Sequence, residues 1–174
     1  MSEVHVTYME QRRRPRRLRT VPPDGHLHIV RLESVPVHFY RYLYDHVGEA
    51  WGWRDRRAWS DLQLDARLKD PGVEIHVLYV GGVPAGYAEL DRTLGHDCEL
   101  RLFGLMPEFL GRGLGPFFLA EMLDHAWSGE TMRVHLSTCS LDHPSALNMY
   151  LRFGFVIYRE ETTQQAPADA AAAL

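Results

Sequence analysis

Apolar and polar positions along the 174-residue chain follow two periods, and their order predicts the elements of one domain. Strand-like alternation or short apolar runs cover residues 26–34, 73–80, 83–92, 98–106, 131–140 and 155–160. Apolar residues at helical spacing cover residues 36–47, 57–69, 116–127 and 142–153. Gly81-Gly82, between two of the strands, is typical of a two-residue hairpin. This order predicts an α/β domain whose mixed, mostly antiparallel sheet is flanked by helices.

Charge and composition set both ends of the chain apart from this pattern. Six of the 19 basic residues fall between Arg12 and Arg19, although the formal net charge of the chain is −4. We therefore predict a flexible arginine-rich arm over residues 1–25, a single domain over 26–160 and a disordered, alanine-rich tail over 161–174. The arm could touch nucleic acid, but no aromatic residues interleave its arginines to stack on bases, so the sequence favours a solvated arm.

The cysteines, the apolar stretches and the histidines of the chain bear on its cellular compartment and on metal binding. The two cysteines, Cys98 and Cys139, are too few for a disulfide framework, and no apolar stretch is long enough to cross a bilayer. We therefore expect a cytoplasmic protein. His26 and His28 alternate on a predicted strand without a third ligand nearby, so no metal site is expected.

Residues 110–118, LGRGLGPFF, place three glycines between a predicted strand and a predicted helix. Bare backbone N–H groups at the start of a helix bind anions, and the helix dipole strengthens the attraction, which predicts a phosphate-binding loop. The spacing excludes a dinucleotide-binding G-x-G-x-x-G turn, and the absence of lysine excludes a Walker A loop. A tight connection without a ligand would need only one or two glycines.

The glycine loop and the residues around it resemble the GNAT N-acetyltransferase superfamily. GLMPEFLGRGLGPFFLAEMLDHA, residues 104–126, is similar to the pyrophosphate-binding segment of that superfamily, whose pattern is [Q/R]-x-x-G-x-[G/A]. The two required small residues are Gly113 and Gly115. The leading Gln or Arg of the pattern falls on Leu110, which is a departure, and a basic side chain follows at Arg112.

A second segment strengthens the resemblance. DHPSALNMYLRFGF, residues 142–155, is similar to the closing pattern N-x-x-A-x-x-x-Y-x-x-x-G-F of the same superfamily. Ala146, Tyr150, Gly154 and Phe155 stand on matching positions, and His143 replaces the usual Asn. The two segments follow each other in the expected order, with a helix and a strand between them.

The resemblance implies the GNAT fold and binding of acetyl-CoA as cosubstrate. The cofactor-binding residues that it implies are Phe103, Gly104, Leu105, Arg112, Gly113, Leu114, Gly115, Phe117, His143, Ala146 and Tyr150. The pantetheine arm would pair with the strand end at 103–105, because a glycine within the strand and a proline after it suggest a bulge or a splay. The Leu105 amide would polarise the thioester oxygen. Alternatively, Gly104 only relieves crowding against a neighbouring strand.

The same resemblance suggests which side chains move protons. Strict alternation places Glu99 on the same face as Phe103 and Leu105, so Glu99 is the candidate base and Glu89 the substitute. Arg101 could instead hold Glu99 in a surface ion pair. Tyr150 is the implied general acid for the departing thiolate, although a buried core tyrosine would show the same helical spacing.

The acceptor is the least defined part of the prediction. In the resembled fold the first two helices wall the acceptor cleft, where Trp51, Trp53 and Trp59 could stack on a flat or cationic substrate or pack between helices. Cys139, near Asp142 and His143, offers a minor alternative with a thiol nucleophile.

We therefore predict an acetyl-CoA-dependent N-acetyltransferase that acts on a primary amine of a small molecule or a peptide, with a homodimer as one possible assembly. One alternative is a sensor that binds acyl-CoA without turnover. The other is an acyltransferase that uses a different acyl chain or a hydroxyl acceptor.

Overall fold

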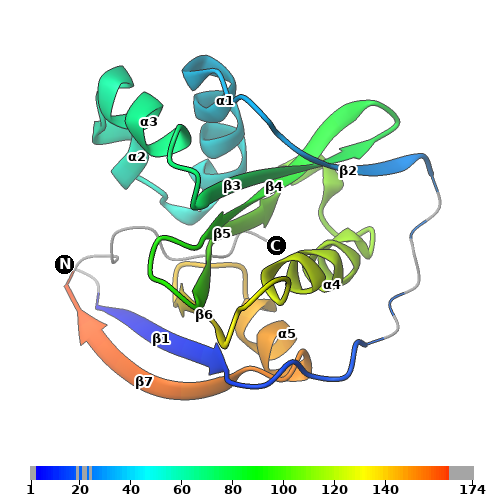
Figure 1. The fold of residues 1–174 in the computed structure, drawn as a ribbon, viewed down its shortest axis with the longest axis vertical. Coiled ribbons are helices and arrows are strands. Elements are labelled where there is room, and N and C mark those ends of the chain that lie inside the picture. The colour runs from blue at the N-terminus through cyan, green and yellow to red at the C-terminus, as the bar shows by residue number, and fades with distance from the viewer. Residues whose placement is uncertain (1–2, 19, 21–22, 24, 165–174) are drawn as a thin grey trace.

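The computed structural model describes residues 3–18, 20, 23 and 25–164, which form a seven-stranded sheet with helices on both sides (Figure 1). The strands are β1 (Val4–Gln11), β2 (Leu27–Arg31), β3 (Val73–Val80), β4 (Val83–Asp91), β5 (Asp97–Leu105), β6 (Arg133–Cys139) and β7 (Val156–Thr163). The helices are α1 (Val37–Gly48), α2 (Asp55–Ala58), α3 (Asp61–Leu68), α4 (Leu114–Ala126) and α5 (Ala146–Arg152), with short 3₁₀ turns η1 (Glu49–Trp51) and η2 (Pro107–Phe109). The predicted α/β class is confirmed.

The strand order is β2-β3-β4-β5-β6-β1-β7, and β5 and β6 are the parallel pair among antiparallel neighbours. Helices α1 to α3 lie on one side of the sheet and α4 and α5 on the other (Figure 1). Each side has its own hydrophobic core. Phe103 and Phe118 lie in the core on the side of α4, and Tyr40, Tyr44 and Tyr87 lie in the core on the side of α1. These sides are called the α4 face and the α1 face.

Most predicted elements are present, with shifted ends. Gly81 and Gly82 form the predicted hairpin turn, with φ angles of +58° and +83° that favour glycine. The single helix predicted over 57–69 is instead two helices. The second one begins after Ser60, whose hydroxyl oxygen accepts a hydrogen bond from the Gln63 N–H while the Gln63 side-chain oxygen accepts one from the Ser60 N–H.

The prediction of a flexible arm is wrong for residues 4–11. They form β1, which pairs with β6 on one edge and with β7 on the other. The side chains of Val6 and Met9 are fully buried, so apolar burial and two sets of backbone hydrogen bonds hold this segment. Strand β7 likewise extends to Thr163, into the predicted tail, and residues 165–174 lie outside the described residues.

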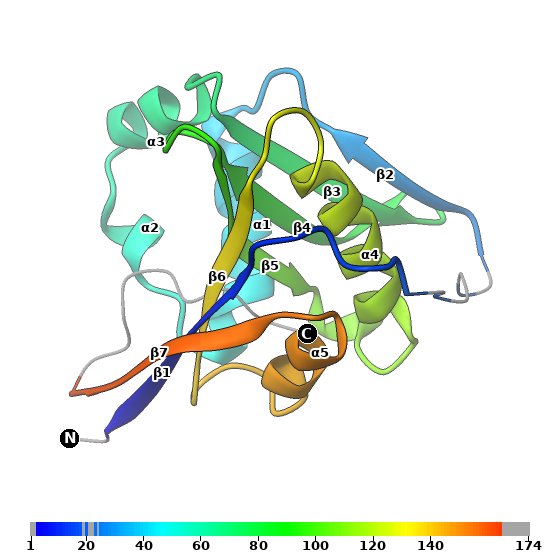
Figure 2. The ribbon, with the colours of Figure 1, turned by 60° about the horizontal axis from the view of Figure 1, so that its bottom comes forward.

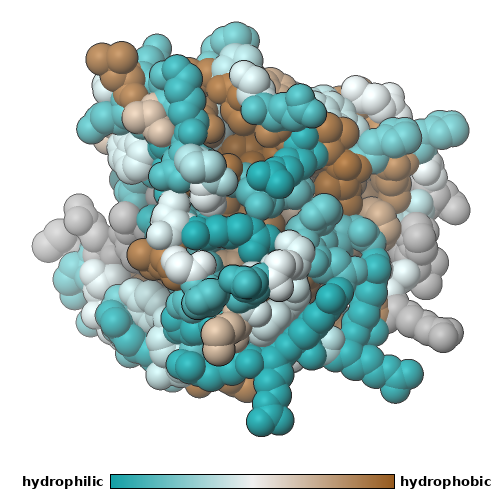
Figure 3. Space-filling view, viewed as in Figure 1, coloured by the Kyte–Doolittle hydropathy of each residue, from teal (hydrophilic) through white to brown (hydrophobic). Residues whose placement is uncertain are grey.

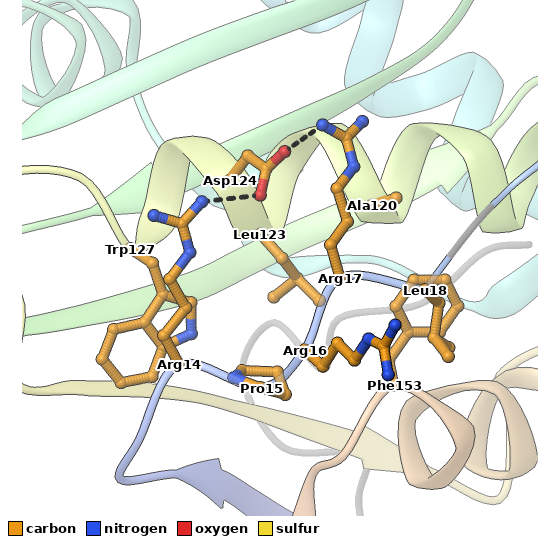
Figure 4. Close-up of a pocket in the computed structure, with 10 residues that line it drawn as sticks. All are labelled: Arg14, Pro15, Arg16, Arg17, Leu18, Ala120, Leu123, Asp124, Trp127 and Phe153. Carbon is orange, nitrogen blue, oxygen red and sulfur yellow. Dashed lines mark hydrogen bonds and ion pairs between the residues drawn. The ribbon is translucent and has the colours of Figure 1, made fainter.

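The described residues that follow β1 run along α4 towards β2 (Figure 2). Arg14 reaches the Asp124 carboxylate at 2.9 Å, and Arg17 reaches the same carboxylate at 2.5 Å and also Glu121 (Figure 4). These arginines, predicted to be solvated, therefore pair with acidic residues of α4. Each pair is about half exposed, so each contributes only a few tenths of a kcal/mol to about 1 kcal/mol.

The hydropathy of the molecular surface varies across the face seen in Figure 3. In the view of Figure 3, the surface is largely hydrophilic over its lower half, and hydrophobic side chains show in its upper part. Within the part of the chain that the structure describes, no helix is both long and apolar enough to span a bilayer.

We predict that Val6→Asp destabilises the protein by about 3 kcal/mol or more, because a carboxylate would replace a fully buried side chain between two paired strands. His5→Asp, one residue away and exposed, is the matched control and should cost about 1 kcal/mol at most. Urea unfolding of both variants measures the difference. Equal stabilities would show that β1 does not insert into the sheet.

Candidate active site

Strands β5 and β6 pair over only three residues and then separate. Asp97, Cys98 and Glu99 lie beside residues 133–135, whereas residues 100–105 of β5 pair with β4 alone. On its other edge, β6 pairs with β1 from Val134 opposite Gln11 to Cys139 opposite Val6. The two strands therefore form a V, called the splay, whose free edge on β5 is not covered by β6.

The free edge of β5 presents backbone N–H groups to the splay. The Met106 N–H donates to the carbonyl of Ala85, a residue of β4, at 2.8 Å. Because successive N–H groups of an extended chain point to opposite edges, the Leu105 and Phe103 N–H groups point away from β4, towards the splay. The alternative role of Gly104, relief of crowding against a neighbouring strand, stays a prediction. The close approach involves Gly86, whose added Cβ would lie 2.4 Å from the Gly104 carbonyl oxygen.

The glycine loop opens α4 with unpaired donors. Gly111 and Gly113 both have φ of +73°, and a Cβ added at either would meet nothing within 4 Å, so the space above them is open. Gly113 is the N-cap of α4 and no side chain caps the helix. The Leu114 and Gly115 N–H groups are therefore available to a ligand.

The next two residues of α4 are Pro116, which has no backbone N–H, and Phe117. Pro116 stands at the third helical position, where its missing N–H would be unpaired anyway. Phe117 stands at the fourth helical position, and its predicted contact with the pyrophosphate stays a prediction. Arg112 is exposed, with its guanidinium 5.0 Å from the centre of the Phe109 ring.

A β-bulge changes the face on which Glu99 lies. The register between β4 and β5 shifts after Leu100, which pairs with Leu90, because Leu102 pairs with Glu89. Leu100 and Phe103 consequently both lie in the core of the α4 face, and Leu102 lies in the core of the α1 face. The prediction that Glu99 shares a face with Phe103 and Leu105 is therefore wrong. Arg101 is the extra residue, and it pairs with Glu99 at 3.2 Å.

Glu89, the predicted substitute base, belongs to a buried ion-pair cluster. It is fully buried, and its carboxylate accepts hydrogen bonds from the Tyr40 hydroxyl at 2.7 Å, from Arg56 at 3.2 Å and from Arg67 at 2.7 Å. Arg67 also bonds Asp91. The Glu89 carboxylate is enclosed by Tyr40, Arg56 and Arg67 and has no exposed surface, so an amine in the splay cannot reach it. The structure therefore does not support Glu89 as the base.

Tyr150 lies on α5 in the same buried core as Phe103, Leu114 and Ala146. The side chain is fully buried and contacts the Phe155 ring edge-on, with ring centres 5.8 Å apart. Burial raises the pKa of the Tyr150 phenol well above 10, and the nearby Asp142 raises it further. The phenol is therefore protonated at neutral pH, as a proton donor must be.

Asp142, which the sequence marked only as a neighbour of Cys139, is a buried acidic residue. Its Oδ2 accepts hydrogen bonds from the Thr138 hydroxyl and from the Cys139 N–H, both at 2.8 Å. Burial raises the pKa of this carboxyl to about 6. A single aspartate before a helix has no sequence signal that separates it from a surface residue, because its burial comes from packing between β6 and α5.

The thiol-nucleophile alternative finds no support. Burial raises the pKa of the Cys139 thiol to about 11, so the thiolate is scarce at neutral pH. The His143 ring lies close to Ser145, with Nδ1 2.7 Å from the Ser145 hydroxyl oxygen. Among the described residues, no group of three or more His, Cys, Asp or Glu side chains is arranged to hold a metal ion.

The three tryptophans of the predicted acceptor region have different surroundings. Trp53 is buried against Tyr44 and Tyr87, so it packs between elements. Trp59 lies under the Arg56 guanidinium at 4.0 Å. Trp51 contacts the ring of His143 edge-on at 5.3 Å, which brings the turn after α1 against the loop between β6 and α5. Trp51 and His143 therefore lie together although 92 positions separate them in the sequence.

Comparison with known proteins gives the family to which this fold belongs. The model of the acetyltransferase (GNAT) family matches residues 40–155, which is more than half of the chain. The chain belongs to this family.

Individual relatives are more distant. N-alpha-acetyltransferase RimI of Mycobacterium tuberculosis (strain ATCC 25618 / H37Rv) is 34% identical over 104 residues, which cover 56% of this chain and 61% of the relative. A GCN5-related N-acetyltransferase from Sphaerobacter thermophilus has the same fold, with a TM-score of 0.63 and 19% identity over 98% of this chain and 54% of its own. A spermidine N-acetyltransferase from Vibrio cholerae, solved with CoA and spermine, gives a TM-score of 0.52 and 19% identity over 75% and 80% of the two chains.

We predict that Asp142→Asn stabilises the protein at pH 8 and has little effect at pH 4. The folded-state pKa of about 6 exceeds the ordinary 3.8, so the stability from this group is complete below pH 3.8 and is lost as the pH rises through 6. The loss is about 3 kcal/mol at most. Asn keeps an acceptor for the Thr138 and Cys139 donors without the buried charge. Urea unfolding of both proteins at the two pH values measures the effect, and a pH-independent difference would contradict it.

Proposed function

We propose that this protein is an acetyl-CoA-dependent N-acetyltransferase that acetylates a primary amine. The observation that carries the proposal is the open splay between β5 and β6 beside the uncapped, glycine-lined start of α4. The two features are complementary to the two ends of one molecule, because the loop offers donors for a diphosphate and the splay offers a strand edge for an amide-containing arm. Membership of the GNAT family supports acetyl-CoA as this molecule.

The donor would be held from its diphosphate to its thioester. The N–H groups of Leu114 and Gly115, with Gly113 and Arg112 beside them, would bind the diphosphate. The pantetheine arm would pair with β5 at Phe103, Gly104 and Leu105. The Leu105 N–H, which points into the splay, would donate to the thioester oxygen as negative charge develops there. His143 and Ala146, at the start of α5, would contact the arm from its other side.

Transfer requires one proton to leave the amine and another to reach the thiolate of CoA. Tyr150 would donate to the thiolate, because its buried phenol stays protonated at neutral pH. The amine has a pKa near ~10 in water and must lose its proton before it attacks. Glu99, the base predicted from the sequence, points to the α1 face, which would be the side from which this proton leaves.

The acceptor class is taken from the relatives. The name N-alpha-acetyltransferase supports the α-amine of a peptide, and the spermidine N-acetyltransferase supports a polyamine. A panel of short peptides with free N-termini and of polyamines, incubated with acetyl-CoA and assayed for released thiol, tests the proposal. Binding of acetyl-CoA without thiol release would indicate a sensor, and release with alcohols alone would indicate a hydroxyl acceptor.

We predict that Gly113→Ala weakens acetyl-CoA binding about tenfold or more, because the added Cβ would occupy the space proposed for the diphosphate. Gly129→Ala is the matched control, since Gly129 also has a positive φ, of +65°, and open space around it, but lies beyond the other end of α4. The backbone strain is similar in both variants. Calorimetric titration with acetyl-CoA measures the affinities, and equal losses in both variants would contradict a cofactor site at the loop.

We predict that Tyr150→Phe lowers kcat about 10²-fold and leaves the affinity for acetyl-CoA nearly unchanged, because only the proton donor is removed. Thiol release gives kcat, calorimetry gives the affinity, and a melting curve verifies folding. A folded Tyr150→Phe variant with full kcat would make Tyr150 a core residue and not the acid.

A further inference from the structure

His135 has no role in the site described so far, and the sheet places it beside Glu99. It lies on β6 directly opposite Glu99 of β5, in the last register pair before the two strands separate. Val134 and Leu136, its neighbours in β6, are buried in the core of the α4 face. Because side chains alternate along a strand, His135 points to the α1 face, as Glu99 does. The two side chains therefore lie side by side at the apex of the splay.

We propose that His135, which lies beside Glu99, accepts the proton that the amine loses when it attacks the thioester. The inference rests on the proposed function and names the proton acceptor within it. His135 would receive the proton, while Glu99 stabilises the imidazolium that forms. This division of roles uses a neutral imidazole as the base and a carboxylate as its partner.

The surroundings of His135 suit a base. The side chain is half-buried, and no hydrogen bond to its ring nitrogens is present among the described residues, so a nitrogen is available to a proton. The Glu99 carboxylate is close enough to raise the pKa of His135, but burial lowers it further, to below the ordinary 6.5. The ring is therefore neutral at pH 7. The charged groups that surround it are Asp91 on β4, Asp97, Glu99 and Arg101 on β5, Arg133 on β6 and Glu10 on β1.

Glu99 forms an ion pair through one of its two carboxylate oxygens. Arg101 pairs with Oε1 of Glu99 at 3.2 Å, and Oε2 lies outside that pair. The Glu99 carboxylate favours a positive charge on the neighbouring imidazole, which is the role assigned here.

The distance between Glu99 and Phe103 along β5 decides whether the amine proton reaches His135 directly or through water. The bulge removes one residue from the path, so Glu99 and Phe103 are separated by three strand rises, or about 10 Å. An amine at a thioester held near Phe103 or Leu105 is therefore beyond direct contact with His135. The proton would pass through water in the splay, as is common for general bases.

The step balances in atoms and charge. The amine nitrogen forms a bond to the acetyl carbon, the C–S bond breaks, and the sulfur leaves with the electron pair. The nitrogen proton moves through water to His135, and the thiolate takes a proton from Tyr150. The imidazolium returns its proton to solvent and Tyr150 regains one, so that the products are one amide and one thiol.

The experiment measures kcat/KM against pH with two amines of different pKa that the acceptor panel has identified. The rise of kcat/KM that reflects deprotonation of the amine should move with the pKa of the amine. A second rise, below pH 6.5, should stay at the same pH for both amines and is called the fixed limb. His135→Gln should remove the fixed limb and lower kcat/KM about 10²-fold. His28→Gln, at an exposed histidine on the distant edge strand β2, is the matched control and should change neither.

Three further measurements separate catalysis from structure. Added imidazole should restore activity to His135→Ala at least about tenfold, which a structural role would not allow. Glu99→Gln should lower the pH of the fixed limb, because the charge that favours the imidazolium is lost. Calorimetry should show unchanged acetyl-CoA affinity in every variant.

The outcomes are distinguishable. If the wild-type protein binds acetyl-CoA but releases no thiol with any amine, the proposed function fails. If the wild type is active and a folded His135→Gln variant keeps both its rate and its fixed limb, the role of His135 is overturned while the proposed function stands.

Discussion

The division of β6 between two partners is the constraint on which the site depends. One edge of β6 pairs with β1 from Val134 to Cys139, whereas the other edge pairs with β5 only from Arg133 to His135, because β5 diverges from β6 beyond that point. The edge that is left free is that of β5, from Leu100 to Leu105. An uncovered edge inside a domain is unfavourable unless a ligand or water satisfies its backbone groups. Strand β1 is therefore part of the site, although none of its residues lies at the edge where a cofactor would pair.

The sequence predicted the parts of this arrangement that are local. The glycine loop was recognisable because positive φ angles and open space require glycine at fixed positions before a helix, and Gly111 and Gly113 have both. The hairpin at Gly81-Gly82 was recognisable because its turn also requires positive φ angles. The order of the central elements was recognisable from the spacing of apolar residues within each element. Each depends on residues close together in the chain, so a single sequence contains the whole signal.

The parts that the sequence did not predict are nonlocal. Strand β1 depends on partners more than 120 positions away, and the arginines that follow it dominate the composition of the segment. The bulge at Arg101 depends on the register with β4, and it reversed the inferred face of Glu99, because the side-chain period of a strand is two. Glu89 and Glu99 were equivalent candidates by sequence. Burial among Tyr40, Arg56 and Arg67 separates them, and no pattern within one strand reveals it.

The two faces of the sheet offer a reason for the opposite proton transfers that acetyl transfer requires. Tyr150 belongs to the core of the α4 face, where burial keeps its phenol protonated, whereas Glu99 and His135 point to the α1 face. A donor and an acceptor of protons in direct contact would exchange with each other and be of little use to the substrate. The splay is an opening through which a thioester would be accessible from both faces, so that the amine could lose its proton on one side while the thiolate gains one on the other. The separation of the proposed acid from the proposed base by the sheet follows from the bulge, because strict alternation through Arg101 would place Glu99 on the same face as Phe103 and Leu105.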